Sequence, residues 1–145
     1  MNFISDFMTN SHRECDNLFA VAEESAAKGK WQKVQAEFDA YRSEIERHLV
    51  MEEKVLFPAF DAKTGMEMGP TYVMRSEHQQ MRKLIDDMAQ MITAKDSDGY
   101  LGVSETLMVL TQQHNMKEEQ MLYRMMDQAF GAEGRALLER DGAAL

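Results

Sequence analysis

Apolar side chains recur every three or four positions along most of this chain, which is the spacing of one buried face of an α-helix. Four stretches show the pattern, at about residues 5–28, 30–60, 71–95 and 99–130. Their inward-facing positions are, in order, Phe7 or Met8, His12, Cys15, Phe19 and Ala22; Val34, Phe38, Tyr41, Ile45, His48, Glu52 and Val55; Met74, His78, Met81, Ile85, Met88 and Ile92; and Leu107, Thr111, His114, Glu118, Met121 and Met125. No segment alternates apolar and polar residues with the period of two that a strand requires. The pattern therefore predicts an all-α protein.

Short breaks separate the four predicted helices. Gly29 ends the first helix, residues 61–70 form the longest loop, and residues 96–99 provide the cap before the fourth helix. Residues 132–140 are expected to add a short terminal helix. Helices of this length joined by short loops favour an antiparallel up-down-up-down four-helix bundle with a short C-terminal extension. A chain of 145 residues is long enough for one core and too short for two, so we expect residues 1–145 to form a single domain.

The composition limits the kinds of binding partner and the cellular compartment that we expect for this protein. The net charge of −9 disfavours nucleic acid and anionic membrane surfaces, because both attract basic proteins. No apolar run approaches the roughly 20 residues of a membrane span. The single cysteine, Cys15, cannot form an internal disulfide, and the first residues do not resemble a secretory signal. We therefore expect a cytoplasmic protein.

All four histidines and two of the glutamates interrupt the apolar lines. The first and third helices each carry one histidine, and the second and fourth each carry a His-x3-Glu pair. Residues four apart share a helix face, so each pair directs an imidazole and a carboxylate toward one point. The six candidate metal ligands are His12, His48, Glu52, His78, His114 and Glu118.

The six residues are also predicted to lie at one depth in the bundle. His12 and His48 each lie about 18 residues from the turn between their helices, and so do His78 and His114. Burying two carboxylates without a cation costs several kcal/mol each, whereas a pair of metal ions removes this cost. Imidazole and carboxylate donors suit iron, manganese or zinc. The alternative is a metal-free bundle in which hydrogen-bonded histidines occupy the core.

The motifs distinguish between two classes of di-metal bundle. Ferritin-like bundles use Glu-x-x-His motifs, and no carboxylate precedes any histidine by three residues here. The chain instead resembles the hemerythrin-like family, the HHE cation-binding domain, over about residues 8–130. The resemblance is carried by His12, by the segment from His48-Leu49-Val50-Met51-Glu52-Glu53 to Leu56-Phe57-Pro58, by Glu77-His78, and by His114-Asn115-Met116-Lys117-Glu118-Glu119.

This resemblance implies a non-haem di-iron centre with Glu52 and Glu118 as bridges and an oxo or hydroxo oxygen between the ions, in a site where zinc or manganese can replace iron. Oxygen-carrying hemerythrins place a fifth histidine where Met74 stands, and an aspartate where Glu119 stands. With two histidines for each iron, both ions could keep an open position. This departure argues against simple reversible O2 carriage and leaves room for redox turnover.

Four further residues are secondary candidates for the site. Glu53 and Glu119 follow the proposed bridges and point about 100° away, so each is either a ligand or a neighbour of the ligands. Glu77 is expected either to orient an imidazole or to face solvent. Met74 takes the place of the fifth histidine, and the resemblance makes it a residue to examine.

The resemblance implies a protein that binds or reduces a small diatomic molecule or peroxide, with O2, peroxide and NO as the candidate ligands. Such a protein could be a di-iron oxidoreductase or consume peroxide, and the sequence does not decide whether it is an enzyme. The alternative is an iron- or oxygen-responsive regulatory module that acts through a protein partner. These hypotheses differ in turnover, because the regulatory module predicts iron-dependent stability without consumption of peroxide.

Overall fold

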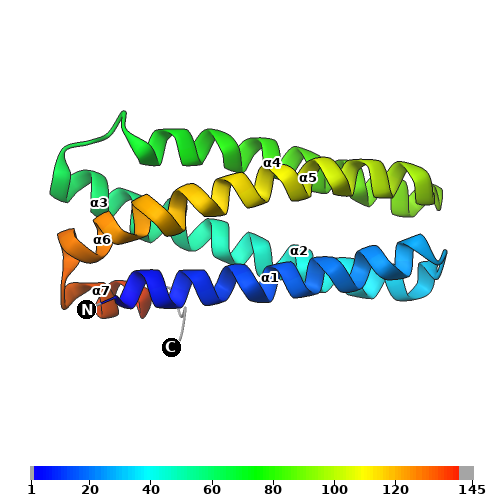
Figure 1. Cartoon of the computed structure of the whole chain (residues 1–145), viewed down its shortest axis with the longest axis horizontal. Coiled ribbons are helices and arrows are strands. Elements are labelled where there is room, and N and C mark those ends of the chain that lie inside the picture. Colours follow the sequence, from blue (N-terminus) through cyan, green and yellow to red (C-terminus); the bar gives the residue numbers. More distant parts are fainter. Residues whose placement is uncertain (1, 141–145) are drawn as a thin grey trace.

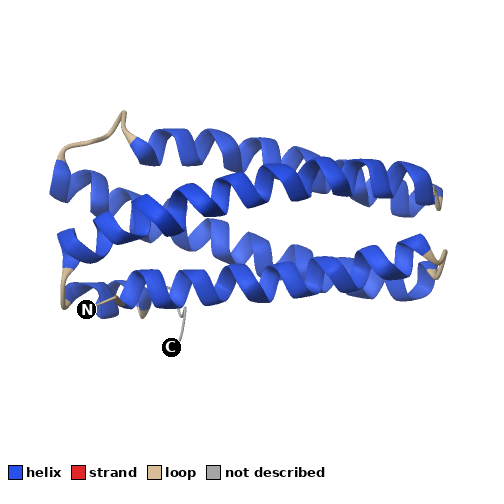
Figure 2. Cartoon of the chain, in the orientation of Figure 1, coloured by secondary structure: helices blue, strands red, loops and turns tan. Residues whose placement is uncertain are grey.

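Helices make up nearly the whole chain in the computed structural model, which describes residues 2–140. No strand occurs within these residues, so the all-α prediction is confirmed (Figure 2). The elements are α1 (Phe3–Ala27), α2 (Trp31–Met51), η1 (Glu52–Leu56), α3 (Phe57–Thr64), α4 (Pro70–Ala94), α5 (Ser97–Lys117), η2 (Glu118–Leu122), α6 (Tyr123–Phe130) and α7 (Glu133–Leu138). The η elements are single π-helical turns that continue the preceding helix directly into the next.

The long helices lie side by side along the long axis of the molecule and form a helical bundle (Figure 1). The α1–α2 turn and the α4–α5 turn lie at one end, and the α3–α4 loop lies at the other end (Figure 1). The predicted helix at 30–60 is the continuous run α2–η1–α3, and the predicted helix at 99–130 is the run α5–η2–α6.

Local chemistry explains where the helices end. Gly29 and Gly65 adopt positive φ angles of 68° and 72°, which glycine reaches without steric cost. The Asp96 side chain accepts a hydrogen bond from the backbone N–H of Gly99 at 2.9 Å and caps α5, as the sequence predicts. The first turn of α1 is capped from a distant element, because Asp127 of α6 accepts a bond from the backbone N–H of Ile4 at 2.9 Å.

Two apolar clusters form the core, one toward each end of the bundle. One gathers buried residues from both terminal segments and the α3 region, and includes Ile4, Phe57 and Tyr123. The other packs α1, α2, α4 and α5 together and includes Phe38 and Leu107. Ten of the buried side chains in the described part of the chain are polar or charged, and the six candidate ligands are among them.

The inward lines predicted for the first three helices are correct, but the end of the fourth is wrong. Met121 is 52% exposed, and the buried positions between Glu118 and the end of α6 are Leu122, Tyr123, Met126 and Phe130. The cause is the π turn η2, in which the backbone N–H of Tyr123 bonds to the carbonyl of Glu118 five residues earlier. The wider turn shifts the buried face relative to an unbroken α-helix.

Among residues 2–140, no helix combines the length and the apolar character needed to cross a membrane.

Candidate metal centre

The six candidate ligands converge in one buried cluster. The relative exposure of each lies between 0% and 4%. His12 comes from α1, His48 from α2, His78 from α4 and His114 from α5. The two glutamates, Glu52 and Glu118, each open a π turn. As the sequence analysis expects, these side chains come together in the interior, where their donor atoms form two converging groups.

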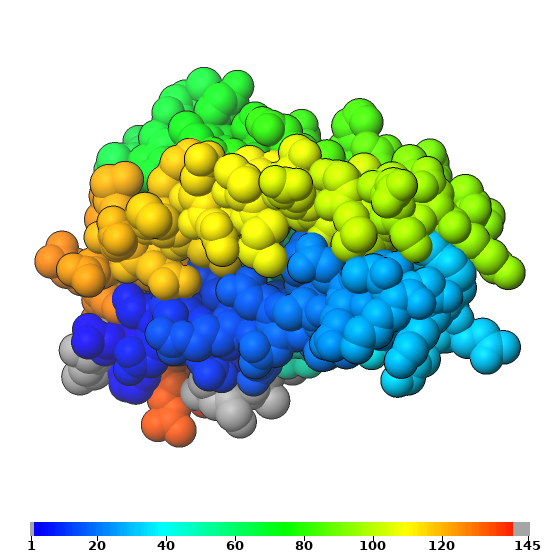
Figure 3. All heavy atoms as spheres, turned by 45° about the vertical axis from the view of Figure 1, so that its right-hand side comes forward, coloured from blue at the N-terminus to red at the C-terminus, as the bar shows by residue number. Residues whose placement is uncertain are grey.

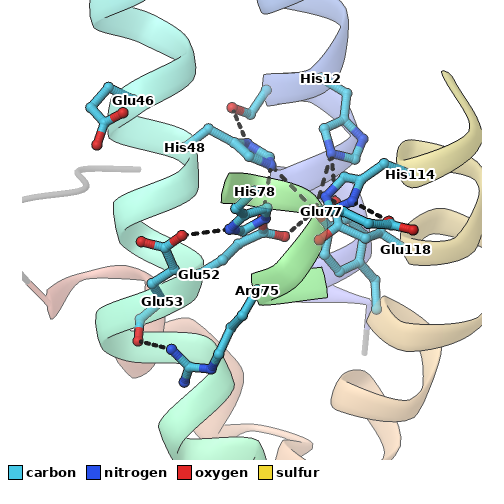
Figure 4. A network of polar contacts seen from close by, with 12 residues as sticks. His12, Glu46, His48, Glu52, Glu53, Arg75, Glu77, His78, His114 and Glu118 are labelled. Atoms are coloured by element: carbon cyan, nitrogen blue, oxygen red, sulfur yellow. Dashed lines mark hydrogen bonds and ion pairs between the residues drawn. The ribbon is translucent and has the colours of Figure 1, made fainter. Parts of the chain in front are cut away.

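The cluster has two halves (Figure 4). The rings of His12 and His48 lie 4.6 Å apart, and the rings of His78 and His114 lie 5.0 Å apart, measured between centroids. Each carboxylate lies between the halves. Glu118 Oε1 is 3.1 Å from His12 Nε2 and 3.3 Å from His114 Nε2.

Glu52 repeats this arrangement with the other two histidines. Its Oε1 atom is 3.6 Å from His48 Nε2 and 3.1 Å from His78 Nε2. Two sets of donor atoms each converge closely enough to hold one ion, and they share a glutamate. The sets are Glu52, His78, His114 and Glu118, and His12, His48 and Glu118.

A side chain outside the cluster holds the Nδ1 atom of every one of these histidines. Three of these partners are carboxylates: Glu119 for His12 at 2.7 Å, Glu53 for His78 at 2.7 Å, and Glu77 for His114 at 2.8 Å. The fourth is the hydroxyl of Ser11, which lies 2.8 Å from His48 Nδ1. When Nδ1–H donates to a carboxylate, Nε2 is left with its lone pair toward the cluster, as metal-binding imidazoles require.

Charged side chains on the neighbouring helices fix two of the carboxylate partners. Arg82 of α4 donates to both oxygens of Glu53, at 2.7 and 3.0 Å, and also reaches Glu46. Lys117 of α5 donates to Glu77. Figure 4 shows Arg75 donating to the backbone carbonyl of Glu53. Charged side chains near the surface of the bundle therefore help to hold His78 and His114 in place through Glu53 and Glu77.

The pKa values of the two buried carboxylates are shifted in opposite directions. Burial and the nearby Glu118 raise the pKa of Glu52 to about 7. Burial acts the same way on Glu118, but the hydrogen bond from Glu52 and the adjacent His114 outweigh it and hold its pKa well below the usual range. Burial favours neutral His114, yet the Glu118 carboxylate beside it raises its pKa to about 9. The cluster thus favours positive charge beside its two carboxylates.

Several polar atoms of the cluster have no hydrogen-bond partner among residues 2–140. They are Glu52 Oε1, His78 Nε2, His114 Nε2 and Glu118 Oε2, all buried. His78 Nε2 and Glu52 Oε1 are 3.1 Å apart, but their contact lacks hydrogen-bond geometry. A buried polar atom without a hydrogen-bond partner lowers the stability of the folded protein. All four of these atoms belong to side chains proposed as metal ligands. Imidazole nitrogens and carboxylate oxygens suit first-row transition metals, so the donor set fits a bound cation.

Sequence reasoning missed a seventh polar side chain in the cluster, that of Tyr123. Its hydroxyl donates to Glu52 Oε2 at 2.7 Å or to Glu118 Oε1 at 2.8 Å, and lies 3.1 Å from His12 Nε2 and 3.4 Å from His48 Nε2. Tyr123 is fully buried, and burial together with the two carboxylates raises its pKa well above the ordinary value.

A repeat in the sequence could have revealed this tyrosine. Residues 48–57 read HLVMEEKVLF and residues 114–123 read HNMKEEQMLY, so both follow the pattern His-x3-Glu-Glu-x2-Leu-aromatic. In both segments the first glutamate opens a π turn, and the aromatic residue five positions later donates its backbone N–H to that glutamate. The π turn places this aromatic residue against the cluster, where an unbroken α-helix would turn it aside.

The secondary candidates have separate positions around the cluster. Glu53, Glu77 and Glu119 each contact the outer nitrogen of an imidazole, and Glu77 contacts His114 rather than the adjacent His78. Met74 is 3% exposed and belongs to an apolar core cluster. The assignment of any of these residues as ligands stays a prediction.

A small cavity lies beside the cluster. A cavity of about 10 Å³ borders His12 and is lined mostly by apolar groups, including Phe19 and Ile45. This volume corresponds to about one water-sized molecule. On the face seen in Figure 3, the side chains of α1 (blue) meet those of α5 (yellow) along much of their length. The interior is accordingly shielded from bulk water on this face.

A buried set of nitrogen and oxygen donors inside a helical bundle defines a cation-binding helical domain. Comparison with protein families agrees with this class, because the model of the "Hemerythrin HHE cation binding domain" family matches residues 4–126. The chain therefore belongs to the hemerythrin family. In comparisons with curated proteins and with solved structures, none matches the chain significantly.

Proposed function

We propose that the chain is a non-haem di-iron protein that binds or reduces O2, peroxide or NO. The observation that carries this proposal is the convergence of four imidazoles and two carboxylates, with unpartnered buried donor atoms on Glu52, His78, His114 and Glu118. Family membership supports cation binding, and the choice of two iron ions is ours. When bound, iron supplies electron transfer and open coordination positions for a small ligand.

Each pair of histidines is assigned to one of the two proposed metal ions. His12 and His48 would hold one ion, His78 and His114 would hold the other, and both carboxylates would bridge. The position of each carboxylate supports this role, since Glu52 and Glu118 each approach one imidazole of each half within 3.1 to 3.6 Å. The outer hydrogen bonds keep the rings oriented so that little rearrangement is needed on binding.

The surroundings of the cluster would limit side reactions. The six proposed ligands are at most 4% exposed, and two apolar clusters flank them. A dry site excludes water from reactive ligands and strengthens electrostatic interactions. The small cavity beside His12 has room for about one water-sized molecule.

The topology of the bundle, the domain boundaries and the cellular location are also part of this proposal. The succession of turns at opposite ends in Figure 1 supports an antiparallel up-down-up-down topology for the long helices. The cytoplasmic location and the single-domain boundaries remain predictions from the sequence.

The proposal is tested by loading the full chain with ferrous iron under anaerobic conditions and mixing it separately with O2, hydrogen peroxide and NO. We expect a change in visible absorption with at least one of them, and no change in the His114→Ala variant, which lacks a central donor. Gln113→Ala is the matched control, because Gln113 precedes His114 on α5 and is exposed. An iron-loaded protein that reacts with none of the three molecules would contradict this function.

A regulatory module is the second candidate, because the unpartnered buried atoms link iron occupancy to folding. Such a module would act through a protein partner that reads the folded state. It predicts a large rise in melting temperature on iron binding and no turnover of peroxide. Measuring peroxide consumption and the melting temperature on one iron-loaded sample separates the two functions.

A further inference from the structure

The hydroxyl of Tyr123 lies at a point where one proton cannot satisfy its neighbours. Glu52 Oε2 and Glu118 Oε1 are hydrogen-bond acceptors at 2.7 and 2.8 Å. His12 Nε2 is a third acceptor at 3.1 Å when this imidazole is in the neutral form that metal binding requires. A phenol has a single proton to donate. As a hydrogen-bond donor the phenol can therefore serve only one of these three acceptors at a time.

The spacing around the hydroxyl is that of donor atoms around one metal ion. At metal–ligand distances of about 2.0–2.2 Å, neighbouring donor atoms of one ion lie roughly 2.8–3.3 Å apart. Tyr123 Oη lies 3.1 Å from His12 Nε2, 3.4 Å from His48 Nε2 and 2.8 Å from Glu118 Oε1. The three residues that carry these atoms make up the smaller converging donor set.

In the part of the chain that the structure describes, the other half of the cluster has no equivalent hydroxyl. Five residues after Glu52 stands Phe57, whose ring stacks on His78 with centroids 5.6 Å apart. Five residues after Glu118 stands Tyr123, whose ring lies 5.6 Å from that of His12. The two halves therefore present the same arrangement of imidazoles, carboxylates and an aromatic ring, but one half alone carries a phenol oxygen.

We propose that Tyr123 is a direct ligand, through its phenolate oxygen, of the ion held by His12 and His48. Phenolate is an established protein ligand of iron. On ligation, the O–H bond of the phenol is replaced by an oxygen–iron bond, and the proton leaves to solvent. No electron is transferred in this step. The inference rests on the proposed di-iron function and adds a seventh protein ligand to it.

This ligand makes the two metal positions unequal. Side chains offer five donors to the ion beside His12 and His48, counting Glu52, Glu118 and Tyr123, and four to the ion beside His78 and His114. An external ligand therefore binds on the His78–His114 half, where Phe57 supplies an apolar wall. The sequence alone leaves both ions with an open position, and Tyr123 fills one of them.

The test compares the full-length wild type with Tyr123→Phe and, as a control, Tyr100→Phe, which removes the hydroxyl of another buried tyrosine outside the cluster. Each protein is loaded with ferrous iron anaerobically, oxidised with ferricyanide, assayed for iron and examined by resonance Raman spectroscopy with visible excitation. We expect phenolate ring modes in the wild type and in Tyr100→Phe and none in Tyr123→Phe. Ring-deuterated tyrosine should shift these modes in the wild type.

Azide binding to the ferric proteins gives a second readout. We expect one azide per chain in the wild type and two in Tyr123→Phe, because loss of the phenolate leaves an open coordination position on the ion held by His12 and His48. Iron-loaded wild type without phenolate modes, or with equal azide binding in both proteins, overturns ligation by Tyr123 and leaves the di-iron site intact. A wild type that takes up no iron overturns the proposed function itself, and ligation by Tyr123 with it.

Discussion

Phe57 and Tyr123 are equivalent residues on opposite sides of one buried cluster. Each follows a cluster glutamate by five positions and donates its backbone N–H to the carbonyl of that glutamate across a π turn. The centroid of each aromatic ring lies 5.6 Å from the ring centroid of a cluster histidine. The shared pattern of residues 48–57 and 114–123 thus has a structural counterpart. The one chemical difference between the two positions is a hydroxyl group.

Phe57→Tyr should make the two halves alike. Phe57 is fully buried beside His78, and the added oxygen points from a ring that already stacks on that imidazole. We expect the ferric variant to gain phenolate intensity in its Raman spectrum and to bind less azide than the wild type. Circular dichroism checks that the larger side chain is accommodated, and Phe57→Leu controls for loss of packing. Unchanged spectra in a folded, iron-loaded Phe57→Tyr protein would contradict the equivalence.

Glu53→Gln should weaken metal binding without removing a cluster donor. Glu53 accepts from His78 Nδ1 at 2.7 Å and from Arg82, and these hydrogen bonds outweigh its burial and lower its pKa to about 2. Loss of this charged partner makes the His78 imidazole less basic and a weaker metal ligand, so we expect the affinity for iron to fall by about 10- to 100-fold. Competition with a chelator measures the change. Glu46→Gln is the matched control, since Glu46 contacts Arg82 at the surface, and an equal loss in both variants would argue against orientation of His78.

Glu52→Gln should stabilise the metal-free protein while lowering its iron content. Glu52 is fully buried near a second carboxylate, and a neutral amide of the same shape avoids that repulsion. We expect the free energy of unfolding in urea to rise by about 1 kcal/mol or more in the metal-free form. The exposed control Glu105→Gln should stay within about 0.5 kcal/mol of the wild type. A large loss of stability in Glu52→Gln would indicate a structural carboxylate instead.

Cys15 should resist alkylation in the folded protein. It is 3% exposed, and burial with the nearby Glu44 and Asp16 raises its pKa to about 12. At pH 8 roughly one thiol in ten thousand would be ionised, and the thiolate is the reactive form. The raised pKa also means that this thiol favours folding below about pH 9, and that its contribution declines as the pH rises toward 12. Iodoacetamide should label Cys15 in urea and leave it largely unlabelled in buffer; rapid labelling of the native protein at pH 8 would contradict its burial.

The sequence was sufficient to predict the helices and the meeting of six side chains. Periodicity located the buried faces, and equal distances from the turns placed His12 level with His48 and His78 level with His114. The prediction failed after Glu118, because it assumed 3.6 residues per turn through a π turn. That assumption turned Met121 inward in the prediction, and it left Tyr123 outside the site.

The partners of the imidazoles were harder to predict from the sequence. Ser11 precedes a candidate ligand on α1, but it contacts His48 on α2. Glu77 likewise contacts His114 on a different helix from its own. Such contacts depend on how adjacent helices are rotated about their axes, which a single sequence does not specify. Helical periodicity gives each buried face only to within the width of a side-chain stripe.

Metal content tests the central claim most directly. The full chain, purified without a tag and reconstituted anaerobically with ferrous iron, should hold about two iron ions by mass spectrometry, the number that two converging donor sets would take. Glu118→Ala should lose most of that iron, because Glu118 belongs to both sets. A wild-type chain that holds no iron after reconstitution would contradict the account, and its buried histidines and glutamates would then require another partner.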